Sequence, residues 1–514
     1  MKRKKLIVPM VLSLLVAACS SGNAGNSVGS TDASTDASGT GKAAGQASQT
    51  ESNALKPYDL TMAVPIFGAI PPDVQVVQDE LNKLTQAKIN TTVTILPISI
   101  GAWGQQMNLM MSGGEKLDVA FSMGAGGMYQ SAAATGKLYP LDDLLEKYGQ
   151  GIVEQVGQEY VEGARYNGKL YAVPTNRNFG QAAALFMRKD LVEKHNIDVA
   201  AIKTIDDLDN VFKIIKENEP GVVPLAAGLS SPLEFYRTFD RLGDSYGVLP
   251  GFDNGMKVEN HYERPEYADL LNKVRAWYKA GYINKDAATT QTVPNEFLKA
   301  KKAFSYMHNY APGNVENESR AVGMELVYAQ LTPAYTETNH ILSGMWTIAQ
   351  QSEDPERAMM FLNLLYTDKE VLNLFKWGVE GKHYVKVSDN VIDYPAGVTA
   401  ANVGYSLNTL IIPNHFIGYT MKSEDPNLWQ NVKEFNQTTE KSKALGFSYN
   451  ASALKNETAA LSNVVEQYKR VLETGSVDPA DKLPEFIDKL KKAGIEKVIA
   501  EKQKQLDEWA AGKQ

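Results

Sequence analysis

Apolar residues recur along the first part of the chain in two alternating patterns. Short runs rich in β-branched and aromatic residues predict strands at 58–67, 91–96, 117–123 and 169–174. Between the first two runs, apolar residues from Val74 to Leu84 recur on one helical face, directly after Pro72-Asp73. Strands that alternate with helices predict βαβ units and a largely parallel sheet.

The same alternation continues beyond residue 200. Thr204 and Asp207 have the spacing of a capping box in front of a helical pattern, and a strand is predicted over 222–227. A further helix is predicted to begin at Asp354-Pro355, because Pro is favoured in the first turn. Residues 456–512 are almost wholly helical in pattern. Together these patterns predict an α/β protein with a helical carboxyl-terminal part.

The amino terminus has the layout of a secretory signal. Residues 2–5 are all Lys or Arg, and an apolar run follows over 6–18 and ends in the small pair Ala17-Ala18. A membrane-spanning helix needs about 20 apolar residues, and this run is well short of that. The sequence therefore predicts export by a signal peptide over residues 1–18.

The only cysteine of the chain stands directly after the small pair. The motif Val16-Ala17-Ala18-Cys19 resembles the bacterial lipoprotein box, which implies cleavage before Cys19 and acylation of its sulfur and new amino terminus. Several acyl chains hold a protein on a membrane without a spanning segment. The alternative is an unmodified cysteine behind an ordinary signal. Residues 20–50 have little apolar surface, so we expect 19–56 to be a disordered tether carrying the lipid.

Composition narrows the range of partners. Removing the signal leaves 48 of 52 basic residues against 60 acidic ones, a formal charge of −12. Such a balance argues against binding to nucleic acid or electrostatic adhesion to anionic lipid. With Cys19 acylated, neither disulfides nor thiol chemistry are available. The remaining chain exceeds the roughly 250–300 residues that one hydrophobic core usually serves, so we expect two lobes.

Motifs for catalysis or metal binding are absent from the sequence. The six histidines show no H-x-x-x-H grouping, and no G-x-S-x-G elbow, phosphate loop or dinucleotide fingerprint occurs. The acidic pairs at 142–143 and 206–207 stand at helix starts, where capping explains them better than glycoside hydrolysis. We therefore expect a protein with no metal, no cofactor and no enzymatic activity.

A series of phrases occurs in the order seen in extracellular solute-binding proteins of carbohydrate ABC transporters. They are "GEKLDVAFSMG", "YNGKLYAVPTN", "ALFMRKDLVEKHNI", "TIDDLDNVFKIIKE", "KKAFSYMHNYAPG" and "SGMWTIAQQSEDPERAMMFLNLLY". "LFKWGVEGKHYVK" (374–386) and the segment from "PNHFIGYT" (413–420) to "LPEFIDKLKKAGIEKVIAEKQKQLDEW" resemble the lipoprotein subfamily with a carboxyl-terminal DUF3502 region. Each phrase alone is weak evidence, but in order they cover most of the chain.

This resemblance implies the type II periplasmic-binding-protein fold. Two α/β lobes joined by a hinge would close on a solute in the cleft between them. Placed by the resemblance, the first lobe takes 57–178 and 343–380, and the second takes 179–342 and 381–514, which includes the DUF3502-like region. Residues 175–181 and 343–347 then become hinge or cleft-floor segments.

A sugar offers C–H groups that pack on aromatic faces and hydroxyl groups that need polar hydrogen-bond partners. Candidate partners of both kinds stand at or just after predicted strand ends, where open α/β sheets bind ligands. The candidate ligand-binding residues are Phe67, Trp103, Tyr129, Asn176, Arg177, Phe179, Gln181, His308, Tyr310, Trp346 and Trp377. For each of them the alternative is a structural place in a lobe core or turn.

Two functions are compatible with these features. The first is a lipid-anchored monomer that captures a carbohydrate, in particular an oligosaccharide, outside the membrane and delivers it to the permease subunits of an ABC transporter. The second is a binding protein of the same fold for a peptide or an organic anion, because a fold does not determine its ligand. Aromatic residues beside neutral amides favour the sugar.

Overall fold

The structure is a computed structural model that describes residues 55–124 and 127–513. The predicted signal peptide, Cys19 and the tether up to residue 54 lie outside the described residues. No helix in the described part of the chain is long and apolar enough to cross a membrane.

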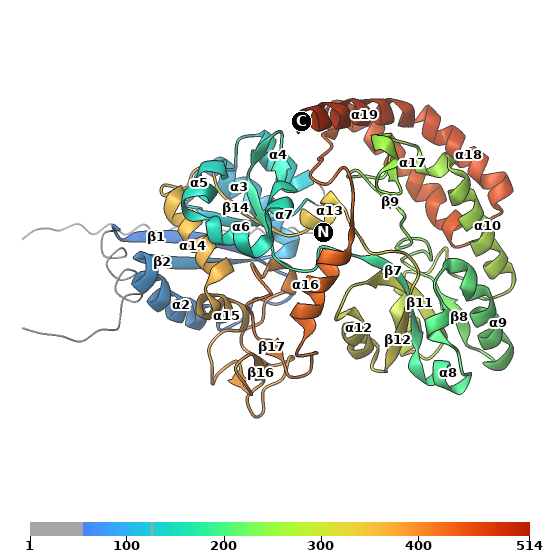
Figure 1. The fold of residues 1–514 in the computed structure, drawn as a ribbon, viewed down its shortest axis with the longest axis horizontal. Coiled ribbons are helices and arrows are strands. Elements are labelled where there is room, and N and C mark those ends of the chain that lie inside the picture. Colours follow the sequence, from blue (N-terminus) through green and yellow to red (C-terminus); the bar gives the residue numbers. More distant parts are fainter. Residues whose placement is uncertain (1–54, 125–126, 514) are drawn as a thin grey trace, which may run out of the picture. The chain divides into compact units, whose positions relative to one another are not determined.

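The first sheet has the strand order β2-β1-β3-β14-β6. Figure 1 labels β1, β2 and β14 of this sheet. Its strands are β1 (Tyr58–Ile66), β2 (Thr91–Ser99), β3 (Val119–Ser122), β6 (Ala172–Pro174) and β14 (Met345–Ile348). β1 runs parallel to β2 and β3, whereas β14 runs antiparallel to β3 and β6. The sheet is therefore mixed rather than largely parallel, because a strand from beyond residue 340 returns between two strands of the amino-terminal part.

The amphipathic helix predicted after Pro72-Asp73 forms as α2 (Val74–Ile89), and its buried face includes Val77 and Leu81. The helix predicted at Asp354 also forms, with Asp354 accepting a hydrogen bond from the Arg357 amide at 2.9 Å. The helices and short strands of this part are α3 (Ile100–Gly113), α4 (Met128–Ala134), α5 (Asp142–Tyr148), α6 (Gln150–Val156), α7 (Gln158–Glu162), β4 (Arg165–Tyr166), β5 (Lys169–Leu170), α14 (Pro355–Thr367) and α15 (Lys369–Trp377).

The second sheet has the order β12-β7-β11-β8. Its strands are β7 (Ala182–Arg188), β8 (Val223–Ala226), β11 (Ala303–Tyr310) and β12 (Leu326–Gln330). β7 runs antiparallel to β11 and β12, and β8 runs parallel to β11. The predicted capping box is confirmed: Asp207 accepts a hydrogen bond from the Thr204 amide at 2.8 Å in front of α9 (Leu208–Asn218). The other helices here are α8 (Lys189–Lys194), α10 (Pro265–Lys279), α11 (Pro294–Lys299) and α12 (Asn314–Val322).

The helical carboxyl terminus is also confirmed. Helices α17 (Lys455–Glu473), α18 (Pro479–Lys492) and α19 (Ile495–Ala511) contact one another, and α17 and α18 contact α10 (Figure 1). Smaller elements are α13 (Thr338–Ile341), α16 (Leu428–Thr438), β9 (Phe239–Asp240), β10 (Leu249–Pro250), β13 (Tyr335–Thr336), β15 (Val385–Lys386), β16 (Val391–Asp393), β17 (Thr420–Met421) and β18 (Glu440–Lys441). Single 3-10 turns lie at Val199–Ala201, Ile205–Asp207, Asn254–Met256, His261–Glu263, Thr409–Ile411 and Ala451–Leu454.

A buried charged cluster links β9 to α13. Glu337 is fully buried and accepts hydrogen bonds from the backbone amide of Arg241 at 2.9 Å and from its guanidinium. The neighbouring Asp240 is 2% exposed, and one of its oxygens accepts from the Leu242 amide at 2.7 Å. Burial, together with the negative charge of Glu337, raises the pKa of Asp240 to about 7.

We expect the effect of Asp240→Asn on the free energy of unfolding to be more stabilising at pH 8 than at pH 4.5. Because the pKa of Asp240 is higher in the folded state, its stabilising contribution is full below about pH 4 and is lost as pH rises through about 7. Asn does not titrate, so the variant-minus-wild-type free energy of unfolding should rise by up to a few kcal/mol over this interval. Chemical denaturation at several pH values measures it. A difference in free energy that does not change with pH would contradict the raised pKa of Asp240. The control is Asp206→Asn, which replaces an exposed carboxylate.

Candidate ligand-binding site

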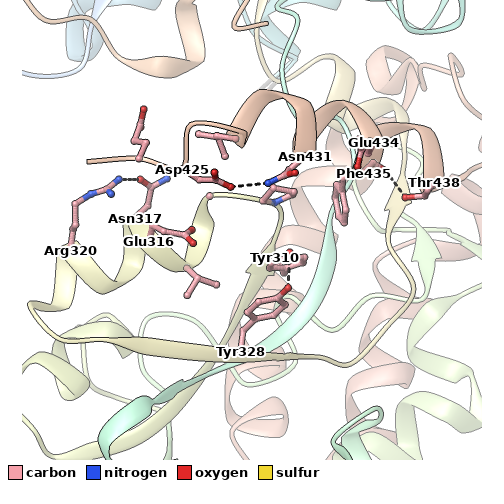
Figure 2. Close-up of a pocket in the computed structure, with 15 residues that line it drawn as sticks. Tyr310, Glu316, Asn317, Arg320, Tyr328, Asp425, Asn431, Glu434, Phe435 and Thr438 are labelled. Atoms are coloured by element: carbon pink, nitrogen blue, oxygen red, sulfur yellow. Dashed lines mark hydrogen bonds between the residues drawn. The ribbon is translucent and has the colours of Figure 1, made fainter. Parts of the chain in front are cut away.

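A pocket of about 400 Å³ lies at the carboxyl end of β11 (Figure 2). Tyr310, the last residue of β11, forms one wall, Tyr328 of β12 lies beside it, and α12, α16 and the loops before these two helices supply the remainder. Gly313 connects β11 to α12 with φ of 88°, and a Cβ there would lie 2.7 Å from the Leu428 side chain of α16. Glycine therefore permits the close approach that places α16 over this end of the sheet.

Three aromatic rings line the pocket. Tyr310 and Tyr328 stack with ring centroids 4.1 Å apart, and Phe435 meets Tyr310 edge-on at 5.8 Å. The Tyr328 hydroxyl donates a hydrogen bond to the Tyr310 hydroxyl at 2.7 Å, which leaves the Tyr310 proton free for another acceptor. Burial, together with this hydrogen bond, raises the pKa of Tyr310, so its hydroxyl stays protonated at neutral pH. The rings offer apolar faces with a polar tip, as sugar recognition requires.

Polar groups line the other side of the pocket. Asn431 donates to the Asp425 carboxylate at 2.8 Å, and both side chains come from α16 or the loop before it. The lining includes four carboxylates, from Glu316, Glu424, Asp425 and Glu434, and one guanidinium, from Arg320. Arg320 donates to the Asn317 side chain and to the Ser423 carbonyl at 3.4 Å. These carboxylates and amides can accept and donate hydrogen bonds to hydroxyl groups.

α16 also holds the segment that connects the two sheets. The Asn436 side chain accepts hydrogen bonds from the amides of Phe179 and Gly180 at 2.8 and 3.2 Å, and donates to the Arg177 carbonyl at 2.9 Å. Because Asn436 follows Phe435 directly, the helix that lines the pocket is bonded to the connection between β6 and β7.

Four of the predicted site residues are core residues in this structure. Trp103, Tyr129, Phe179 and Trp346 are at most 1% exposed and belong to the hydrophobic core around the first sheet. Three of them have partners inside the protein: the Tyr129 hydroxyl donates to the Ala164 carbonyl, Trp346 Nε1 donates to the Ile411 carbonyl at 3.1 Å, and the Phe179 ring stacks on Tyr160 at 4.2 Å. Their placement differs from the expected ligand contact, because burying a large ring against the core contributes more than leaving it at a wet edge.

Asn176, Arg177 and Gln181 lie in the connection between the sheets. Asn176 is 4% exposed and donates to the Asn414 side chain at 3.1 Å. Arg177 donates to the Ser343 hydroxyl and to the His340 carbonyl at 3.3 Å, and burial lowers its pKa to about 10, so it stays charged at neutral pH. Gln181 pairs through its backbone with Tyr335. All three make structural contacts in the connection.

Of the four remaining predicted residues, two lie on β11, one in the loop after β1 and one at the end of α15. Of these, Tyr310 alone lines the pocket, and His308 lies two residues before it on the same strand, partly buried. Phe67 is 40% exposed in the loop that follows β1. Trp377 ends α15 and donates through Nε1 to the Tyr419 carbonyl at 3.1 Å.

The prediction missed the contribution of α16 and its preceding loop. Phe435, Asn431, Asp425 and Glu434 come from a segment about 120 residues beyond Tyr310, and they reach the pocket only through the fold. The sequence signal that could have indicated this wall is the amphipathic pattern over 428–438. Helical spacing alone, however, does not distinguish a pocket wall from a core face. Among the described residues no group of three or more His, Cys, Asp or Glu side chains is placed so that it could hold a metal ion.

Comparison with known proteins identifies relatives that cover most of the chain. The model of the bacterial extracellular solute-binding protein family matches residues 72–371, and the domain of unknown function DUF3502 matches residues 443–511. A protein of Streptococcus pneumoniae named as a carbohydrate ABC transporter substrate-binding protein is 30% identical over 452 residues, 84% of this chain and 87% of its own.

Solved structures agree with this placement. The crystal structure of an N-glycan transport solute-binding protein from Streptococcus pneumoniae covers 89% of this chain and 100% of its own, with 29% identity and a TM-score of 0.79. The structure of that protein in complex with Man1GlcNAc covers 88% and 99%, with 28% identity and a TM-score of 0.67. The chain therefore belongs to the family of bacterial extracellular solute-binding proteins, with the two-lobed α/β fold of that family.

Proposed function

We propose that this protein is the carbohydrate-binding component of an ABC importer. The observation that carries the proposal is the pocket at the end of β11, where a stacked tyrosine pair and Phe435 face a rim of carboxylates and amides. Rings of this kind pack on the C–H faces of sugars, and the rim accepts hydrogen bonds from hydroxyl groups. The carbohydrate names of relatives that align with most of the chain support the same ligand class.

An oligosaccharide suits the site better than a single sugar. The volume of about 400 Å³ is large enough for one or two sugar rings. In this proposal the pocket binds one end of an oligosaccharide.

Capture and release involve a hinge motion. The proposed lobes are 57–178 with 343–380 and 179–342 with 381–514, and a solute that touches both shifts the population toward the closed state. The lower TM-score to the Man1GlcNAc complex than to the structure named without glycan agrees with such a change in that relative. Permease subunits would distinguish the loaded from the empty protein by this shape.

The proposed function also has a membrane anchor and excludes cleavage of the ligand. An acylated Cys19 anchors it at the outer face of the cell membrane, residues 20–50 serve as the tether, and the protein works as a monomer that binds without cleaving. The second candidate is a binding protein for a peptide or an organic anion on the same fold. The four carboxylates of the pocket disfavour an anion, which leaves a peptide as the alternative to test.

A thermal-shift screen of the full-length protein tests this function. Oligosaccharides of several linkages are compared with peptides of similar mass, and the proposal expects a neutral oligosaccharide to raise the melting temperature, because a ligand that binds only the folded state stabilises it. A shift with peptides alone would support the second candidate. Fragments of the sugar appearing during the assay would show an enzyme instead.

The pocket should discriminate between neutral and acidic sugars of equal length. A uronic-acid oligomer brings carboxylates toward Glu316, Glu424, Asp425 and Glu434, while the Arg320 guanidinium already has partners in the protein. We expect such an oligomer to bind about tenfold or more weakly than the neutral one, with the difference shrinking between 0.01 and 1 M salt, where the Debye length falls from about 30 to about 3 Å. Calorimetry measures both. Equal affinities for the two oligomers, or a difference in affinity that does not change with salt, would show that these carboxylates do not discriminate between neutral and acidic sugars.

A further inference from the structure

The loop of residues 227–238 leaves the second sheet at the same edge as the pocket. It follows β8, which runs parallel to β11, so both strands end on one side of the sheet. These twelve residues, all described by the structure, form no helix or strand, and Leu229 within them is 55% exposed. We call this segment the β8 loop. None of its residues lines the pocket, but the loop lies at the same edge of the sheet, where open α/β sheets bind ligands.

One side of the β8 loop contacts the strand that carries the pocket tyrosine. The Phe235 ring packs on His308 with centroids 5.0 Å apart, and His308 precedes Tyr310 by two residues on β11. His308 also packs edge-on against Phe186 of β7 at 5.7 Å. A displacement of Phe235 would therefore change the packing beside Tyr310.

The other side of the β8 loop is bound by α17. The Ser231 hydroxyl donates to the Glu473 carboxylate at 2.5 Å, and Lys469 forms an ion pair with Glu234. Lys469 also lies 3.2 Å from Glu473, which is 3% exposed and accepts a further hydrogen bond from Tyr267 at 3.2 Å. One lysine thus joins a carboxylate of the loop to a buried carboxylate of the helix.

A loop without regular structure keeps one shape only if contacts offset the conformational entropy that its residues lose. The side-chain bonds that hold the middle of this loop come from α17, within the DUF3502 region: Glu473 binds Ser231 and Lys469 binds Glu234. The start of the loop is bonded elsewhere, because the Asn284 side chain exchanges hydrogen bonds with the backbone of Ala227 at 2.9 Å and the Leu229 amide donates to the Thr292 carbonyl at 3.0 Å. We propose that the DUF3502 region is a positioning element for ligand binding: through Lys469 and Glu473, α17 holds the β8 loop in the shape that the solute meets. The expected effect of this positioning role on affinity rests on the proposed carbohydrate-binding function.

Another contact of the same region supplies a matched control. Arg275 of α10 donates to the carbonyls of Gly475 and Ser476 at 2.8 and 3.3 Å, just beyond α17. These hydrogen bonds attach the DUF3502 region to α10 and do not involve residues 227–238. Their loss should weaken the attachment without releasing the β8 loop.

The test compares Lys469→Met, Lys469→Arg and Arg275→Met in the full-length protein. Hydrogen exchange without ligand is expected to become at least tenfold faster over residues 227–238 in Lys469→Met, to stay close to wild type in Lys469→Arg, and to stay unchanged there in Arg275→Met. Affinity for the oligosaccharide found by the screen, measured well below the melting temperature, should fall about tenfold in Lys469→Met alone. Arg275→Met should lower the melting temperature only.

Unchanged exchange in a folded Lys469→Met, or equal loss of affinity in Arg275→Met, would overturn the positioning role. If Lys469→Met does not fold, Ser231→Ala replaces it, because it removes one bond from the loop and leaves the Lys469 ion pairs intact. Faster exchange over 227–238 in Ser231→Ala then supports the role, and wild-type exchange contradicts it. A wild-type protein that binds no glycan would contradict the proposed function instead, while the exchange result still decides the inference.

Discussion

Replacing Tyr310 with Ala is expected to weaken oligosaccharide binding by about tenfold or more. The substitution removes one face of the stacked pair and the edge contact with Phe435, so a sugar ring loses apolar and stacking contact on the order of 1–2 kcal/mol. A factor of ten in affinity corresponds to about 1.4 kcal/mol. Calorimetric titration of the variant and the wild type measures the change directly.

Two variants separate this effect from loss of folding. Tyr310→Phe keeps the ring and removes only the hydroxyl that accepts from Tyr328, so we expect a smaller loss, about threefold, on the order of one neutral hydrogen bond. Tyr278→Ala removes a half-buried tyrosine of α10 that lies outside the pocket lining and should leave affinity unchanged. Equal affinities for Tyr310→Ala and wild type would remove this pocket from the binding site.

Replacing Cys19 with Ala is expected to abolish lipid attachment altogether. The chain has no second cysteine, so no other thiol can carry the acyl chains. Because each buried methylene contributes about 0.8 kcal/mol, loss of several chains should release the protein from the membrane or leave an uncleaved precursor. Labelling bacteria with radioactive palmitate and separating the membrane fraction measures both.

Ser20→Ala is the matched control for Cys19→Ala, since it changes the next residue and keeps the thiol. It should be labelled like the wild type. Radioactive label that persists on the Cys19→Ala protein would exclude the lipoprotein interpretation, and equal loss in both variants would indicate failed export rather than a missing attachment site.

Much of the fold could be predicted from local sequence signals. The Thr204–Asp207 capping box, the start of α14 at Pro355 and the helices from residue 455 onward all depend on contacts within a few residues, which a sequence displays directly. The family phrases anticipated the solute-binding family and the DUF3502 region. The mixed first sheet was not anticipated, because the pairing of β14 with β3 and β6 joins segments far apart in the chain.

The candidate site was less accessible to sequence reasoning. The sequence around an aromatic residue near a strand end does not show whether its ring points into the core or into a pocket. In the structure Trp103 and Trp346 are buried in the core, whereas Tyr310 lines the pocket. Phe435 and Asp425 reach the pocket from α16 and its preceding loop, whose place beside β11 follows from tertiary packing rather than spacing. Sequence could name the chemistry of a sugar site, but only the fold could bring its residues together.

The central claim is that this protein binds a neutral oligosaccharide at the end of β11 without altering it. Calorimetric titration of the full-length protein with neutral oligosaccharides, uronic-acid oligomers and peptides of similar mass tests it most directly. We predict saturable binding of a neutral oligosaccharide at one site, with the sugar recovered intact. Binding of peptides with no heat from any oligosaccharide would contradict the claim.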